Sequence, residues 1–94
     1  MSNKKMRLAV LKELEKGNKN FSHEDLEISA DEFVKIFESL ESEGLIREVD
    51  YYMGPSVDVN SVKLTIKGEE YLTDNSALMK TYKGLKEIRD WFKV

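Results

Sequence analysis

Two helix-start signals follow one another closely within residues 21–45, and together they restrict how the chain can fold. The first is a capping box, in which Ser22 at the N-cap is followed three residues later by Asp25. Phe21 and Leu26 occupy the two positions of a hydrophobic staple around this box, and this pair fixes the direction in which the chain enters the helix. A short helix is therefore predicted to begin at Ser22.

The second signal repeats the same device a short distance along the chain. Ser29 and Glu32 form another capping box. The helix that follows carries apolar side chains at i, i+3, i+4 and i+7 from Phe33 to Leu40, and Gly44 supplies the left-handed residue that ends it. A short helix directly before a longer one predicts a helix-turn-helix.

The chain on either side of this motif supplies a first helix and a hairpin. Residues 4–16 have the apolar period of a helix, and Ser2 or Asn3 is available as its cap. Residues 45–52 and 57–64 are rich in β-forming side chains and are separated by a Gly-Pro turn. These two segments are predicted to pair as an antiparallel hairpin.

The carboxyl-terminal part of the chain is predicted to be helical. Thr65 can cap a helix that runs to about Leu72. A last helix is predicted beyond it, because apolar side chains recur there with helical spacing. They are Leu78, Tyr82, Leu85, Ile88 and Phe92. Gly84 lies inside this predicted helix, where it costs stability unless a close backbone contact or a kink uses it. Phe92 is expected in the core, and the placement of its neighbour Trp91 stays open.

This order of elements predicts one α+β domain over residues 1–94. The expected architecture is a winged helix-turn-helix, with a three-helix core, a two-stranded β-hairpin wing and additional C-terminal helices. The 94 residues suffice for a single modest core. Charged residues make up 35% of the chain and hydrophobic residues 40%, which is typical of a folded rather than a disordered chain.

Four segments of the sequence carry a family resemblance that covers nearly the whole chain. They are KxRxAVLKELxxGN near the start, SEGLI at residues 42–46, LTIKGEEYL at residues 64–72 and the terminal YKGLKEIRDWFK. With these segments the chain resembles the YjcQ family. The resemblance implies a small winged-helix protein of Gram-positive bacteria and their prophages, without an enzymatic activity or functional residues to carry over.

The cysteine content and the apolar runs indicate where the protein resides. The sequence has no cysteine, which excludes a disulfide framework and favours a cytoplasmic location. No apolar run approaches the roughly 20 residues that a membrane-spanning helix needs. Charged residues also interrupt any signal-peptide core near the start. No membrane partner is therefore expected.

The residues that usually carry catalysis or bind metals are sparse. His23 is the only histidine, so one chain has neither a pair of histidine ligands nor a Ser-His-Asp arrangement. The carboxylates of Asp31, Glu38 and Glu41 can approach one another, but a solvated helical face accounts for them. The protein is therefore expected not to be an enzyme, and no cofactor, metal or small-molecule substrate is expected.

The charges oppose DNA binding through the second long helix, although the predicted fold favours it. Residues 22–48 contain nine acidic and two basic side chains, a net charge of −7. Asp31, Lys35 and Glu38 are predicted to point outward from the helix, where one lysine cannot offset the acids. Residues 51–61, the predicted wing tip, contain no Lys or Arg. Because such cations supply most non-specific DNA affinity, both usual contact elements are unsuited to it.

The positive charges lie near the two ends of the chain and leave an alternative open. Residues 1–20 carry a net charge of +4, and residues 80–93 a net charge of +3. If the two terminal helices pack side by side, they form a basic face opposite the acidic one. The alternative function is thus a DNA-binding transcriptional regulator that contacts DNA as a dimer or through its first helix. The candidate contacts are Lys4, Lys5, Arg7 and Lys12.

The leading prediction is a binding module that contacts a protein partner or a second copy of itself, in a phage or prophage setting. At least one large side chain near the wing tip should be exposed, because an alternating strand buries at most half of its residues. Tyrosine and methionine are favoured in protein interfaces. The candidate surface comprises Tyr51, Tyr52, Met53, Asp31, Lys35 and Glu38.

Overall fold

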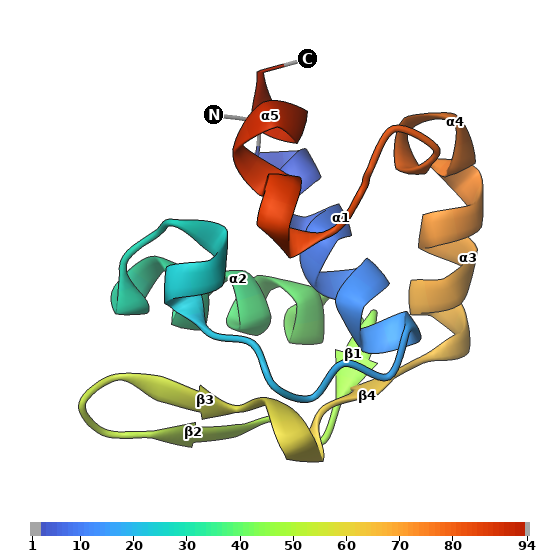
Figure 1. Ribbon diagram of the computed structural model, residues 1–94. Helices are drawn as coiled ribbons and strands as arrows, with labels where there is room; N and C mark the ends of the chain where they lie inside the picture. Colours follow the sequence, from blue (N-terminus) through green and yellow to red (C-terminus); the bar gives the residue numbers. More distant parts are fainter. Residues whose placement is uncertain (1–2, 94) are drawn as a thin grey trace.

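A computed structural model describes residues 3–93 and has an α+β architecture of helices and small antiparallel sheets (Figure 1). The elements are, in order, α1 (Asn3–Glu15), η1 (His23–Leu26), α2 (Ala30–Ser42), β1 (Ile46–Arg47), β2 (Asp50–Tyr52), β3 (Ser56–Asp58), η2 (Val59–Ser61), β4 (Lys63–Leu64), α3 (Ile66–Asp74), α4 (Ser76–Met79), η3 (Leu85–Glu87) and α5 (Ile88–Phe92). The η elements are 3₁₀ turns. Ser2, a candidate cap of α1, lies outside the described residues.

Both predicted helix starts are present, but the first helix is only one 3₁₀ turn. The Asp25 carboxylate accepts a hydrogen bond of 2.8 Å from the backbone N–H of Ser22. Glu27 then adopts a left-handed conformation with φ of 57°, which ends η1. At the second start, the Ser29 hydroxyl accepts from the N–H of Glu32 at 3.1 Å, and the Glu32 carboxylate accepts from the N–H of Ser29 at 3.3 Å. The segment predicted as a helix-turn-helix therefore holds one 3₁₀ turn followed by α2.

Helix α2 ends as the sequence predicts. Gly44 has a φ of 75°, which favours glycine, and its N–H donates to the carbonyl of Glu41 at 2.9 Å. The N–H of Leu45 donates to the carbonyl of Leu40 at 3.0 Å. These two bonds form a Schellman motif, which satisfies the last carbonyls of the helix and turns the chain into β1.

The hairpin is present, but each of its two predicted continuous strands is interrupted. Ile46 pairs with Leu64 in the β1–β4 ladder, and Tyr51 pairs with Val57 in the β2–β3 ladder. Between the ladders, Glu48 has a left-handed φ of 59° on one side and η2 forms a turn on the other. The chain bends at both places, so the outer ladder forms a separate two-stranded ribbon that extends beside α2 (Figure 1).

The prediction of one long last helix is wrong, because the chain reverses between α4 and α5. Gly84 lies in the connecting segment with a φ of 110°, outside any helix. Phe92, which is predicted to lie in the core, is only half-buried and packs against the core, whereas Trp91, whose placement the sequence leaves open, is 3% exposed. The Trp91 indole N–H donates to the hydroxyl of Thr81 at 2.7 Å, and its ring packs on Tyr82 with centroids 4.8 Å apart. The reversal is what brings these three residues together.

Helix α1 runs through the middle of the molecule, with the hairpin and α2 on one side and the terminal segment on another (Figure 1). Its residues Leu8, Ala9, Val10 and Leu11 are all fully buried. A helix buried on several sides is the centre of a core rather than a surface element. None of the helices in residues 3–93 combines the length and apolar character needed to cross a membrane.

Candidate interaction surface

The outward face of α2 carries the charges that the sequence predicts. Asp31, Lys35 and Glu38 are exposed, whereas Phe33 and Phe37 on the opposite face are buried. This division follows from the helical repeat of 3.6 residues, which separates the two groups around the helix axis. The helix therefore presents two acids and one base to solvent.

The β2–β3 ribbon is attached to the flank of α2 by one of its tyrosines. The Tyr51 hydroxyl donates a hydrogen bond of 3.1 Å to the Glu41 carboxylate, and Val57, its partner across the ladder, packs against the core. Partial burial raises the pKa of Tyr51 above its usual value, and the hydrogen bond and charge of Glu41 and the charge of Glu38 raise it further. The phenol therefore stays protonated and keeps the ribbon beside the acidic helix.

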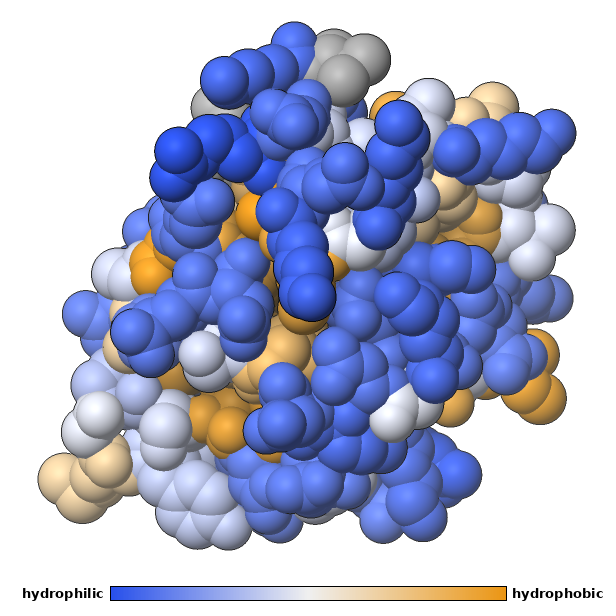
Figure 2. Space-filling view, in the orientation of Figure 1, coloured by the Kyte–Doolittle hydropathy of each residue, from blue (hydrophilic) through white to orange (hydrophobic). Residues whose placement is uncertain are grey.

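The tip of the ribbon carries large apolar groups in solvent. Tyr52 is 56% exposed and Met53 is 100% exposed. In Figure 2, apolar atoms project at the lower left, where Figure 1 places the end of the hairpin, beside a largely hydrophilic surface. A methionine that buries no surface contributes nothing to the core of the monomer, so its side chain is available for a contact with another molecule.

The structure brings together only part of the predicted partner surface. Tyr51, Tyr52 and Met53 form the ribbon, and Glu38 lies close enough to influence the Tyr51 hydroxyl. Lys35 instead lines a cleft of about 430 Å³ between α1 and α2, and Asp31 lies in the first turn of α2. The side of α2 nearest the ribbon is therefore acidic, because Glu38 and Glu41 lie there.

Three of the four candidate DNA contacts are engaged within the chain. Lys5 donates to the carbonyl of Trp91 at 2.9 Å. Arg7 forms an ion pair of 2.5 Å with Glu43, and Lys12 one of 2.7 Å with Glu15. The fourth candidate, Lys4, is exposed near the start of α1.

The ion pair of Arg7 also affects the titration of its partner. The hydrogen bond from Arg7 lowers the pKa of the Glu43 carboxyl below its usual value. Most of the positive charges near the start of the chain therefore take part in contacts within the fold.

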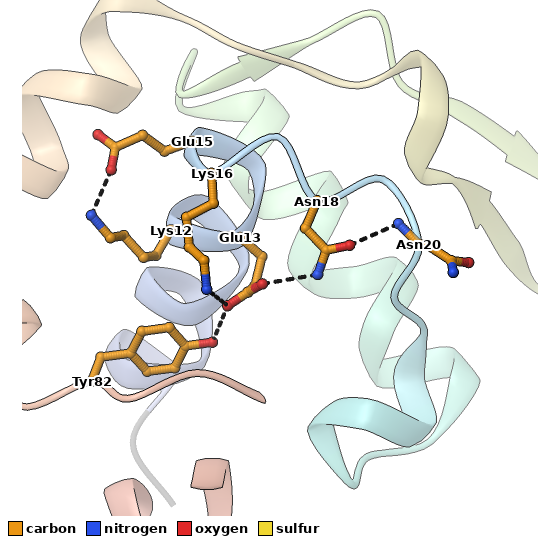
Figure 3. A network of polar contacts seen from close by, with 7 residues as sticks. All are labelled: Lys12, Glu13, Glu15, Lys16, Asn18, Asn20 and Tyr82. Atoms are coloured by element: carbon orange, nitrogen blue, oxygen red, sulfur yellow. Dashed lines mark hydrogen bonds and ion pairs between the residues drawn. The ribbon is translucent and has the colours of Figure 1, made fainter. Parts of the chain in front are cut away.

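Glu13, which sequence reasoning did not single out, is the one charged residue buried among the described positions. It is 2% exposed. Its carboxylate accepts hydrogen bonds from the Tyr82 hydroxyl at 2.6 Å and the Asn18 amide at 2.9 Å, and Lys16 lies 3.4 Å away (Figure 3). Burial raises the pKa of Tyr82, and so do its hydrogen bond to Glu13 and the charge there.

The sequence signal that could have predicted the burial of Glu13 is the apolar content of α1. Apolar side chains cover more than one face of the helix, so a charged side chain among them must also be buried and needs partners. The partners come from the following turn and from the terminal segment. This network ties the terminal segment to α1 and is a structural anchor.

Within residues 3–93, no group of three or more His, Cys, Asp or Glu side chains is arranged to hold a metal ion. His23 is half-buried rather than fully exposed, and its Nδ1 lies 3.1 Å from the carbonyl of Ile28. That contact closes the turn between η1 and α2.

Comparison with known proteins gives one family match and one curated relative. The family model described as "YjcQ protein" matches residues 4–91. The relative, "Uncharacterized protein YjcQ" of Bacillus subtilis (strain 168), is 39% identical over 94 residues, which cover 99% of this chain and 100% of that protein. No solved structure matches the chain.

Proposed function

The chain belongs to the YjcQ family, and we propose that it is a winged-helix module that acts by binding a protein partner or a second copy of itself rather than by catalysis. The order of α1, η1, α2 and the hairpin supports the winged-helix assignment, with η1 as a shortened second helix and the β2–β3 ribbon as the wing. We place this module in a phage or prophage context, as an accessory protein.

The observation that carries this proposal is the exposed tip of the ribbon. Met53 and Tyr52 project into solvent at the end of a two-stranded element that is fixed to α2 through Tyr51. Large apolar groups at such a position contribute favourable free energy only when another molecule covers them and removes them from water. Methionine and tyrosine are also among the residues enriched in protein interfaces.

The surface charges oppose the alternative of a DNA-binding regulator. On the outward face of α2, Lys35 stands between Asp31 and Glu38, and residues 51–61 of the wing contain no Lys or Arg. Phosphate neutralisation requires cations at these elements. The cations of α1 are largely engaged with Trp91, Glu43 and Glu15.

The test compares the wild-type protein with a double variant, Tyr52→Ser and Met53→Ser, by light scattering after size exclusion and by affinity capture at physiological salt. We expect the wild type to form a defined complex, with a captured protein or with itself, and the double variant to lose it. Ile66→Ser is the matched control, because Ile66 is also an exposed large apolar side chain, at 77%, but lies on α3. The proposal is contradicted if the wild type stays monomeric and captures only proteins that the double variant also captures.

A further inference from the structure

The β2–β3 ladder separates its side chains into two faces. Asp50 is paired directly with Asp58, and Tyr52 with Ser56. Because side chains alternate along a strand, these four residues share one face, and Tyr51 shares the other with Val57. Tyr51 and its partner face α2 and the core. We call Asp50, Tyr52, Ser56 and Asp58 the outer face of the ribbon.

The two aspartates of the outer face repel each other. Side chains directly opposite on antiparallel strands have Cβ atoms about 5 Å apart, and like charges there are destabilising. Among the described residues, neither Asp50 nor Asp58 forms an ion pair. The nearest bases along the chain, Arg47 and Lys63, lie 3.5 and 3.6 Å from the carboxylate of Glu48 instead.

One of the two carboxylates is held in a fixed orientation. The Asp58 side chain accepts a hydrogen bond of 3.0 Å from the backbone N–H of Asn60 and so caps η2. Only one of its oxygens takes part in this bond, so the other remains able to accept a hydrogen bond. Asp50, across the ladder, is exposed.

An aromatic ring completes the outer face. Tyr52 lies two residues from Asp50 on the same face and is the more exposed of the two ribbon tyrosines, at 56% against 37% for Tyr51. A planar cation can stack on such a ring while it donates hydrogen bonds to nearby carboxylates. Guanidinium suits this arrangement better than ammonium, because it is planar and presents its donors as a fork.

We propose that the outer face of the ribbon binds an arginine side chain of the protein partner. The proposal deepens the function proposed above and rests on it. The guanidinium stacks on Tyr52 and neutralises the Asp50–Asp58 pair, while Met53 at the tip contacts apolar surface next to that arginine. The repulsion within the free ribbon is relieved on binding, so the same pair that weakens the monomer favours the complex.

The test is a titration of the full chain, followed by its backbone amide NMR signals, with an acetylated and amidated Gly-Arg-Gly-Arg-Gly peptide. Peptides with citrulline or lysine in place of arginine are the controls, because citrulline keeps the shape and lacks the charge. We expect the arginine peptide to shift the signals of Asp50, Tyr52 and Asp58 and to bind more tightly than either control. Equal binding of the citrulline peptide would overturn the proposal.

The matched variants are Asp50→Asn with Asp58→Asn, and Glu69→Gln with Glu70→Gln as the control on α3. Asparagine at position 58 retains an oxygen that can cap η2, so the fold is expected to persist. We expect the first pair to weaken binding of the arginine peptide roughly threefold to tenfold and the control pair to leave it unchanged. If both double variants lost the same affinity for the arginine peptide, binding would depend on the general acidic charge of the protein. That result would contradict a specific site.

The outcome also separates this inference from the proposed function. If the Tyr52→Ser and Met53→Ser variant loses its complex while Asp50→Asn with Asp58→Asn keeps it, the ribbon binds protein without an arginine, and only the inference fails. If the wild type forms no complex, both fail. If light scattering shows a dimer that the aspartate variant loses, the occupant is a second copy, and the assignment to a different partner protein is overturned.

Discussion

Two tyrosine–glutamate hydrogen bonds in this protein have the same chemistry and opposite settings. Tyr82 donates to Glu13 at 2.6 Å, in the interior between α1 and the terminal segment (Figure 3). Tyr51 donates to Glu41 at 3.1 Å, at the surface between the ribbon and α2. The pKa of both tyrosines is raised, with burial as the largest cause in each case.

The difference lies in what replaces the bond when it breaks. Water can hydrate Glu41 at once, whereas Glu13 is 2% exposed and loses one of the few donors that compensate its burial. The terminal segment therefore uses its polar groups to hold the fold together. The ribbon keeps its polar and apolar groups at the surface, where they contribute little to stability and are available for recognition.

The largest expected effect separates the two regions by their apolar groups. Replacing Trp91 by Ala should lower the free energy of unfolding by about 3 to 5 kcal/mol, because it empties a buried aromatic site. Replacing Tyr52 by Ala should change it by no more than about 0.5 kcal/mol. Chemical denaturation measures both. Similar losses at the two positions would remove the distinction between anchor and ribbon.

The two hydrogen bonds can be compared directly by removing one hydroxyl at a time. Tyr82→Phe should cost about 1.5 to 3 kcal/mol, the range for a hydrogen bond to a charged group, since the buried Glu13 loses a donor. Tyr51→Phe should cost less than about 0.5 kcal/mol. The midpoint of urea unfolding, measured for each variant and for the wild type, gives the two stability losses. A larger loss for Tyr51→Phe would reverse the comparison.

Alkaline pH should lower the stability of the fold through the titration of Tyr82. Since folding raises the pKa of Tyr82, its contribution to stability is fully present below the ordinary tyrosine pKa of 10.0 and is lost as the pH rises above it. The loss should be at most about 1.4 kcal/mol per pH unit, and partial exposure of the ring reduces it. Denaturation midpoints measured between neutral and alkaline pH should fall less steeply in Tyr82→Phe than in the wild type. Identical profiles would contradict a coupled titration of Tyr82.

The smallest expected effect concerns the ribbon alone and has the opposite sign. Asp50→Asn should stabilise the fold by about 0.2 to 1 kcal/mol, because it removes the repulsion with Asp58 across the ladder. Glu70→Gln on α3 provides a control for the general effect of removing one acid. Thermal unfolding of the two variants is the measurement. Destabilisation by Asp50→Asn would show that the carboxylate supports the ribbon.

The features that the sequence predicts correctly are determined by neighbouring residues. The capping box of Ser29 and Glu32 and the Gly44 stop involve only a few adjacent positions. The exposure of at least one large side chain near the ribbon tip, seen at Met53, follows from the alternation of side chains along a strand. The YjcQ assignment is likewise confirmed by the family match over residues 4–91.

The features that the sequence did not reveal depend on contacts between distant segments. The apolar period continues through Gly84 and predicts a helix there, although the chain reverses at this residue. The burial of Glu13 depends on Tyr82, which lies 69 residues further along the chain. The breaks in the hairpin strands at Glu48 and η2 likewise carry no strong local signal, since glutamate rarely adopts a positive φ.

The central claim is that the surface of α2 and the ribbon binds protein rather than DNA. Its most direct test is a titration of fluorescently labelled duplex DNA with the protein, followed by anisotropy at low salt. Phosphate-driven affinity is strongest there, so about 50 mM salt and protein up to about 100 μM give DNA binding its best chance. We expect no saturable rise in anisotropy. A saturable rise that weakens steeply with added salt would contradict the assignment of this surface to protein recognition.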